Sequence, residues 1–207
     1  MSDLNFDAAE TSLMFNPDVF LLKRQVNQKI YVLFEQIKIR LKDTSEHKQF
    51  SFPDNTDITT GKISQGENYQ GCPWIMLDFP RLFTKHEIFA FRTLFWYGHF
   101  FTCSILCSGG IAKNKMRSLI GNVKLLHGSE VFFSNHSDAW LHDINDIQFI
   151  KVEELAGADI EKHVAETGYF KLSSKFISTK PEEIVSKTEN IYRLFLNVLS
   201  GSTDAHP

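Results

Sequence analysis

This 207-residue chain has few cysteines, and their number limits the role of disulfides. Three cysteines, Cys72, Cys103 and Cys107, cannot all pair with one another. The N-terminal stretch MSDLNFDAAETSLMF also lacks the basic segment and the continuous apolar segment of a secretory signal. We therefore expect a cytoplasmic protein whose thiols are reduced.

A long hydrophobic run and an excess of one charge are also missing. The run IFAFRTLFWYGHFF contains Arg92 and is interrupted by Gly98, and it is shorter than the roughly 20 residues that span a bilayer. The 22 basic and 25 acidic residues are interspersed and leave a formal net charge of −3. We therefore expect neither a membrane nor a nucleic acid as a partner.

The chain lacks the motifs that would signal a specific chemistry. It has no glycine-rich phosphate loop, no GxSxG turn, no HExxH sequence and no paired CxxC motifs. Cys103 and Cys107 lie in an apolar run that would raise the pKa of a thiol, and Cys72 in its Gly-Cys-Pro loop is expected to be a passive thiol. These patterns predict no catalytic residue and no cofactor.

The chain does have enough apolar sequence for one sizeable core, with 43% hydrophobic residues and 19 Phe. Helix and strand patterns are mixed without a repeated βαβ order. We predict a single α+β domain over 1–207, with a mixed or mostly antiparallel sheet of about 4–6 strands packed with about 4–5 helices. Residues 1–15 and 201–207 are expected to be tails, and 43–62 a surface loop.

Helix-start signals predict four helices. Asn16 followed by Pro17 is a typical cap with proline at the first helical position. Thr84 and Glu87 fit a capping box. The predicted helices run from Pro17 to near Lys42, from about 85 to 97, from Gly110 to about 126, and from Thr179 onward.

Alternation of apolar residues predicts the strands. In WIMLDF, the odd-numbered residues from Ile75 to Phe79 fall on one face and Asp78 falls on the other. The segments HFFTCSILC, EVFFS and AWLHDI are also predicted to be strands. Residues 147–178 fit a helix and a strand, and the sequence leaves that choice open.

The stretch ENYQGCPWIMLDFPR, residues 67–81, combines polar and aromatic side chains around a predicted strand. A buried arginine requires a partner, and we expect Asp78 to pair with Arg92 on the next element. Two interpretations follow: the pair ties the two elements together, or it belongs to a shallow cleft that binds a small anionic or planar ligand. The candidate binding residues are Glu67, Tyr69, Trp74, Asp78, Arg81, Arg92 and Trp96.

A second stretch, NHSDAWLHDIND, concentrates histidine and aspartate, which are frequent metal ligands. A rival hypothesis is a hydrolase-type, metal-assisted enzyme that uses His136, Asp138 and His142. Their spacing matches no standard metal motif, so no metal site is predicted. The leading hypothesis is a binding or interaction module without catalytic machinery, with a small molecule or a protein as its partner. The oligomeric state does not follow from the sequence.

Overall fold

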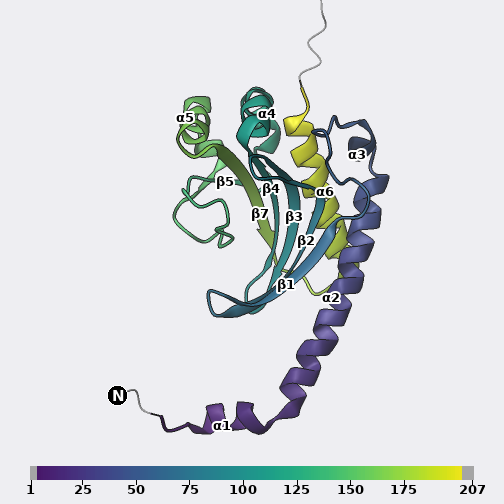
Figure 1. Ribbon diagram of the computed structural model, residues 1–207, viewed down its shortest axis with the longest axis vertical. Coiled ribbons are helices and arrows are strands. Elements are labelled where there is room, and N and C mark those ends of the chain that lie inside the picture. Colours follow the sequence, from purple (N-terminus) through teal and green to yellow (C-terminus); the bar gives the residue numbers. More distant parts are fainter. Residues whose placement is uncertain (1–3, 202–207) are drawn as a thin grey trace, which may run out of the picture.

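The computed structural model describes residues 4–201, and an antiparallel sheet of seven strands organises this part of the chain. Neighbouring strands follow the order β1-β2-β3-β4-β7-β5-β6, and each pair is antiparallel (Figure 1). The α+β class and the antiparallel sheet are confirmed, although the sheet has more strands than the predicted 4–6.

The strands are β1 (Lys62–Tyr69), β2 (Cys72–Phe83), β3 (Ile88–Trp96), β4 (Phe101–Ser108), β5 (Phe132–Ser134), β6 (Phe149–Lys151) and β7 (Tyr169–Phe176). The helices are α1 (Ala8–Phe15), α2 (Pro17–Asp43), α3 (Ser45–Gln49), α4 (Gly109–Asn122), α5 (Gly157–Thr167) and α6 (Pro181–Leu199), with 3-10 turns η1 (Val123–Leu126) and η2 (Val152–Glu154). No helix within 4–201 is long and apolar enough to cross a bilayer.

Helix α2 begins where the sequence predicts. The Asn16 side chain accepts a hydrogen bond from the amide of Asp18 at 3.0 Å, and Pro17 occupies the first helical position. The buried residues of α2 follow at helical spacing on its C-terminal half; they are Ile30, Leu33, Phe34, Ile37 and Leu41. The N-terminal half of α2 therefore contributes no buried residue to the core.

The prediction of a helix over 85–97 is wrong, because residues Ile88–Trp96 form strand β3. The Thr84 hydroxyl accepts hydrogen bonds from the amides of His86 and Glu87, at 3.2 and 2.9 Å, as it would in a capping box. The amide of Thr84 also donates to the carbonyl of Glu87 at 2.9 Å, which closes the β2–β3 hairpin. An interior strand covered on both faces is apolar nearly throughout, and this pattern resembles that of a buried helix.

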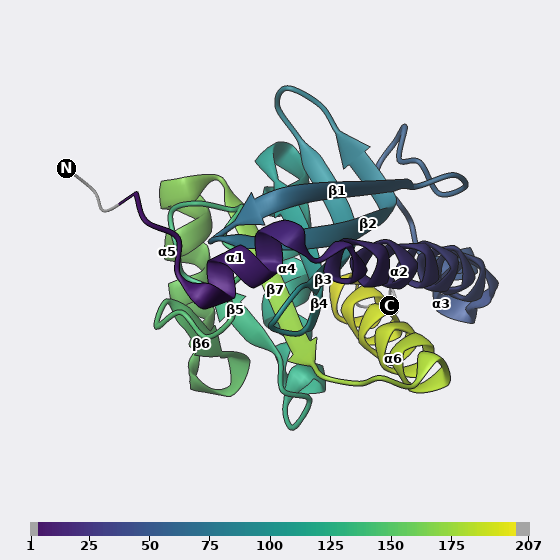
Figure 2. The same cartoon turned by 90° about the horizontal axis from the view of Figure 1, so that it is seen from below.

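One face of the sheet packs against the helices and forms the main core. The odd-numbered residues of β2 from Ile75 to Phe79 lie on this face, as predicted, together with Cys103 and Cys107 of β4. Helices α2, α4, α5 and α6 supply the apolar side chains that cover it. Figures 1 and 2 show α2 and α6 side by side on this layer. The opposite side of the sheet, which we call the second face, carries a smaller cluster of Met76, Leu94, Trp96 and Phe100.

Two segments differ from the predictions, one expected to be a loop and the other a strand. The expected surface loop 43–62 contains helix α3 and buries His47, whose Nδ1 lies 2.6 Å from the Tyr192 hydroxyl. The expected strand AWLHDI is an irregular loop, because aspartate side chains accept from amides two residues ahead and compete with strand pairing. These pairs are Asp138 with Trp140, Asp143 with Asn145, and Asp146 with Gln148.

The remaining segments take defined positions as well. The segment that fits both a helix and a strand contains both, α5 followed by β7. The expected N-terminal tail 1–15 includes helix α1. Of the expected C-terminal tail 201–207, only Gly201 falls within the described residues.

Candidate functional site

A row of polar residues crosses four strands on the second face. Strand register places Asp78 opposite Arg92, Arg92 opposite Ser104, and Ser104 opposite Ser173. Directly opposed residues share one face of a sheet, so the four side chains line up across β2, β3, β4 and β7. The hydroxyls of Ser104 and Ser173 lie 2.9 Å apart within this row.

The predicted ion pair between Asp78 and Arg92 is confirmed. Arg92 Nε donates to Asp78 Oδ1 at 2.7 Å and Nη2 donates to Oδ2 at 2.9 Å, so the contact is bidentate. The two side chains are only 11% and 8% exposed. Arg92 projects from strand β3 rather than from the predicted helix, yet it meets the same carboxylate because β2 and β3 are adjacent.

Lys171 on β7 lies beside this row, opposite Leu106 of β4, and is 2% exposed. Its Nζ donates to the carbonyls of Ala139 and Leu141, at 3.2 and 2.5 Å, and lies 3.3 Å from His142 Nδ1. Burial and the charge of Arg92 lower the pKa of Lys171 to about 7, while Asp138 raises it. The amine is thus surrounded by carbonyls and an imidazole rather than by a contacting carboxylate.

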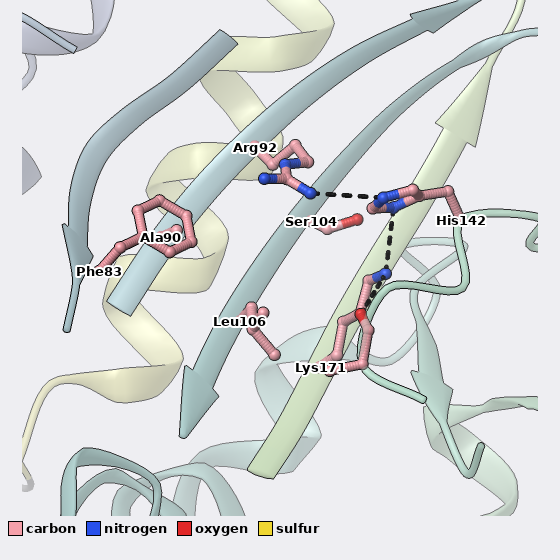
Figure 3. Close-up of a pocket in the computed structure, with 8 residues that line it drawn as sticks. Phe83, Ala90, Arg92, Ser104, Leu106, His142 and Lys171 are labelled. Carbon is pink, nitrogen blue, oxygen red and sulfur yellow. Dashed lines mark hydrogen bonds between the residues drawn. The ribbon is translucent and has the colours of Figure 1, made fainter. Parts of the chain in front are cut away.

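His142 bridges the two basic side chains of Arg92 and Lys171 (Figure 3). Its Nε2 lies 3.3 Å from Arg92 Nη1, opposite the contact with Lys171. Burial, followed by the charges of Lys171 and Arg92, lowers the pKa of His142 well below its ordinary value. A neutral imidazole has one acceptor nitrogen, and the guanidinium can only donate, so Nε2 accepts and the Nδ1–H faces Lys171. Only a neutral amine can accept that hydrogen, which agrees with the lowered pKa of Lys171.

A small cavity of about 10 Å³ lies within this group. This volume is about that needed for one water molecule. Its lining residues are Phe83, Ala90, Arg92, Ser104, Leu106, Ala139, His142 and Lys171 (Figure 3). The ring of Trp140 stacks on Phe83 with centroids 6.3 Å apart, and the Arg92 guanidinium lies 5.3 Å from the Trp140 ring. Loop 135–146 thus borders the cavity through Ala139 and His142, and its Trp140, which is 44% exposed, packs on two other lining residues.

Two of the predicted aromatic residues form a wall next to His142. The Tyr69 hydroxyl accepts from the amide of His142 at 2.7 Å, and burial raises the pKa of Tyr69. The Tyr69 ring meets Trp96 edge-on at 5.1 Å, and Trp96 Nε1 donates to the Tyr69 carbonyl at 3.2 Å. The loop carrying His142 is thereby tied to the end of β1.

The structure places Arg92 and Tyr69 in contact with His142, with Asp78 bound to Arg92 and Trp96 packed on Tyr69. Trp74 borders this group, whereas Glu67 and Arg81 lie elsewhere. Glu67 forms an ion pair with Lys23 of α2. Arg81 Nε lies 3.4 Å from Asp57 Oδ2. The Asp57 carboxylate also accepts a hydrogen bond from the amide of Gly61 in the adjacent turn. Trp74 lies opposite Trp96 and packs with it in the smaller apolar cluster of the second face, over Gly66.

The residues of the metal hypothesis do not share a coordination site. His136 Nδ1 accepts from the amide of Asp138 at 2.8 Å, and the Asp138 carboxylate accepts from Trp140. His142 is occupied by Arg92 and Lys171. Within the described residues, no group of three His, Cys, Asp or Glu side chains is placed to hold a metal ion. The hydrolase hypothesis stays a prediction.

Cys103 and Cys107 have the apolar surroundings that the sequence predicts. Burial raises the pKa of Cys103 to about 12 and raises that of Cys107 as well. Both thiols lie in the main core, on the opposite side of the sheet from Arg92 and Lys171.

Sequence reasoning missed Lys171 and Ser173 as parts of this site. Alternation in YFKLSSKFI places Lys171, Ser173 and Lys175 on one face of a strand, but such a polar face is usually exposed to solvent. Lys171 differs from the other two because it lies near Arg92 and His142. This position follows from the pairing of β7 with β4 and not from the local sequence.

Comparisons with known proteins supply no relative for this arrangement, since no family model, no curated protein and no solved structure matches the chain.

Proposed function

We propose that this protein binds a small anion at Arg92, His142 and Lys171, which we call the cationic site. The observation that carries this proposal is the burial of Lys171 near Arg92, in a site where the contacting carboxylate, Asp78, meets Arg92 and not Lys171. Because Asp78 already receives two hydrogen bonds from Arg92, the charge that Lys171 acquires on protonation has no contacting counterion. An anion would supply one.

The geometry limits the ligand to a small one. Arg92 uses Nε and Nη2 for Asp78, which leaves Nη1 directed toward His142. In the closed site Nη1 donates to His142 and the imidazole N–H faces Lys171. Once His142 moves with its loop, these two groups and the Lys171 amine become three donors suited to a phosphate or a carboxylate group. The cavity of about 10 Å³ holds no such group while loop 135–146 is closed. Binding therefore requires Trp140 and its loop to move outward.

Binding is also expected to consume a proton. An anion next to Lys171 favours the charged amine and raises its pKa above the value of about 7 in the free protein. The affinity should therefore decrease as the pH rises above 7, and binding near neutral pH should take up part of a proton. Calorimetric titration in buffers of different ionisation enthalpy measures this uptake.

The direct test is a thermal-shift titration with inorganic phosphate, acetate and benzoate at about pH 6.5. Saturation at 100 times Kd stabilises a protein by about 2.7 kcal/mol, which corresponds to roughly 5–10 °C for a domain of this size. We expect at least one of these anions to raise Tm in the wild type and not in Lys171→Met. Lys113→Met, at an exposed lysine of α4, is the control and should retain the shift. Equal shifts in all three proteins, or none in the wild type, would contradict the proposal.

A further inference from the structure

The N-terminal arm, residues 6–22, comprises α1 and the first part of α2 and extends away from the sheet (Figure 1). None of these residues is buried. The arm nevertheless has many large apolar side chains that are at least 45% exposed: Phe6, Leu13, Met14, Phe15, Val19, Phe20, Leu21 and Leu22. So many exposed large apolar side chains gathered in one short segment are typical of an interaction site.

The arm and the rest of α2 carry opposite charge. The arm contains Asp7, Glu10 and Asp18 and no basic residue. The following segment, 23–42, contains six basic residues and one acidic residue, Glu35. Two copies arranged with their α2 helices antiparallel would therefore place the acidic arm of each along the basic segment 23–42 of the other.

The basic segment of α2 borders an apolar groove. A hollow of about 920 Å³ lies between α2 and the start of α6, and its apolar lining includes Val26, Val32 and Leu33 of α2 and Ile184 of α6. A second hollow of about 470 Å³ continues it along the same helices and is lined by Ile39 and Val185 among others. The two hollows share Gln36, Pro181 and Glu182, so they form one continuous groove, the α2–α6 groove.

We propose that two copies of this chain form a symmetric dimer by exchanging arms, so that the arm of each copy docks in the α2–α6 groove of the other. Lys29 and Arg40 line the groove and would meet the acidic arm, and the acidic residues of the lining are Asp43 and Glu182. Helix α2 has 27 residues and is about 40 Å long, which is enough for the two antiparallel helices to overlap over the groove. A two-fold axis makes the two contacts equivalent and closes the assembly.

The exposed area of the arm is sufficient for such an interface. Phe6, Phe15 and Phe20 are 66%, 77% and 58% exposed. Since full burial of an aromatic side chain removes about 150–250 Å², these residues from two arms would bury roughly 600–1,000 Å² before any aliphatic residue is counted. The surface of the two grooves adds a comparable area, which reaches the range of about 1,200–2,000 Å² of stable interfaces.

Sedimentation velocity of the full chain tests the proposal, over about 1–100 µM, because interfaces of this size have Kd values of micromolar or below. We expect a dimer for the wild type. Phe20→Asp in the arm and Val32→Asp in the groove should each weaken it at least tenfold, since both side chains are largely exposed in the single chain and their replacement spares the core. Ile147→Asp is the matched control: Ile147 is 93% exposed but lies outside arm and groove, so this variant should remain a dimer.

Mixing the two variants separates arm exchange from pairing of arm with arm. In a mixture of the two variants, Val32→Asp supplies an intact arm and Phe20→Asp supplies an intact groove. Each mixed pair therefore has one intact contact, and dimers of intermediate affinity should reappear. A monomeric wild type overturns the proposal, as does a Val32→Asp variant that dimerises as tightly as the wild type, or a mixture that stays monomeric. Binding of a monomeric wild type to phosphatidylcholine vesicles through the arm would also overturn it. The anion-dependent Tm shift is measured separately, and Phe20→Asp should leave it unchanged.

Discussion

Replacement of Lys171 by methionine tests the electrostatics of the cationic site directly. Methionine keeps an unbranched side chain of similar length but removes the amine, together with its hydrogen bonds to the carbonyls of Ala139 and Leu141. Loss of these bonds changes the free energy of unfolding by an amount that does not depend on pH. The titration of Lys171 adds a contribution that does depend on pH, and the variant lacks it.

The expected magnitude follows from the two pKa values of this lysine. Its pKa is 10.5 ordinarily and about 7 in the folded protein. Between these values the unfolded chain binds more protons than the folded one, so the free energy of unfolding rises with pH, by at most about 1.4 kcal/mol per pH unit. Since Lys171 is still half protonated near pH 7, we expect the wild type to gain about 2 kcal/mol relative to Lys171→Met between about pH 7 and pH 9.

Urea denaturation of both proteins at a series of pH values measures this difference. The comparison requires that the m value, the dependence of the free energy of unfolding on urea concentration, is the same for both proteins. The contribution of Lys171 levels off below about pH 6, where the amine is protonated in both states. The comparison above pH 7 also avoids His142, whose lowered pKa makes stability fall only on the acidic side. Lys113→Met, which removes an exposed lysine of α4, is the control and should give a pH curve parallel to that of the wild type. Parallel pH curves for the wild type and Lys171→Met would show that Lys171 keeps its ordinary pKa, which would refute the reasoning.

Three further changes test the elements that hold the site. Asp78→Ala should destabilise the protein by about 3–5 kcal/mol, because it leaves the buried Arg92 guanidinium without its carboxylate; a loss below about 1 kcal/mol in urea denaturation would indicate a solvated pair. Thr84→Ala should cost about 1 kcal/mol through its hairpin hydrogen bonds, and unchanged stability would show that these bonds contribute little. In Gly66→Ala, the new Cβ would lie 2.6 Å from the Trp74 indole. We expect a loss of about 1–3 kcal/mol and a shifted tryptophan emission, whereas a neutral effect would mean that Trp74 moves freely.

Local sequence was sufficient to determine several parts of this protein. The Asn16-Pro17 cap predicted the start of α2, and alternation in WIMLDF predicted which side chains of β2 enter the core, because these features depend only on residues a few positions apart. The partner of Asp78 was also predictable, since a buried arginine on the adjacent element requires a carboxylate.

The tertiary structure decided the rest. The segment Ile88–Trp96 is apolar on both sides because it lies inside a sheet, and nothing within the segment distinguishes that environment from the buried position of a helix. Arg92 and Lys171 are far apart in the chain, and they meet at one site because β7 pairs with β4 and the loop with His142 folds over both. Strand order depends on contacts between distant segments, so the charge around Lys171, and with it the candidate site, arises only in the folded chain.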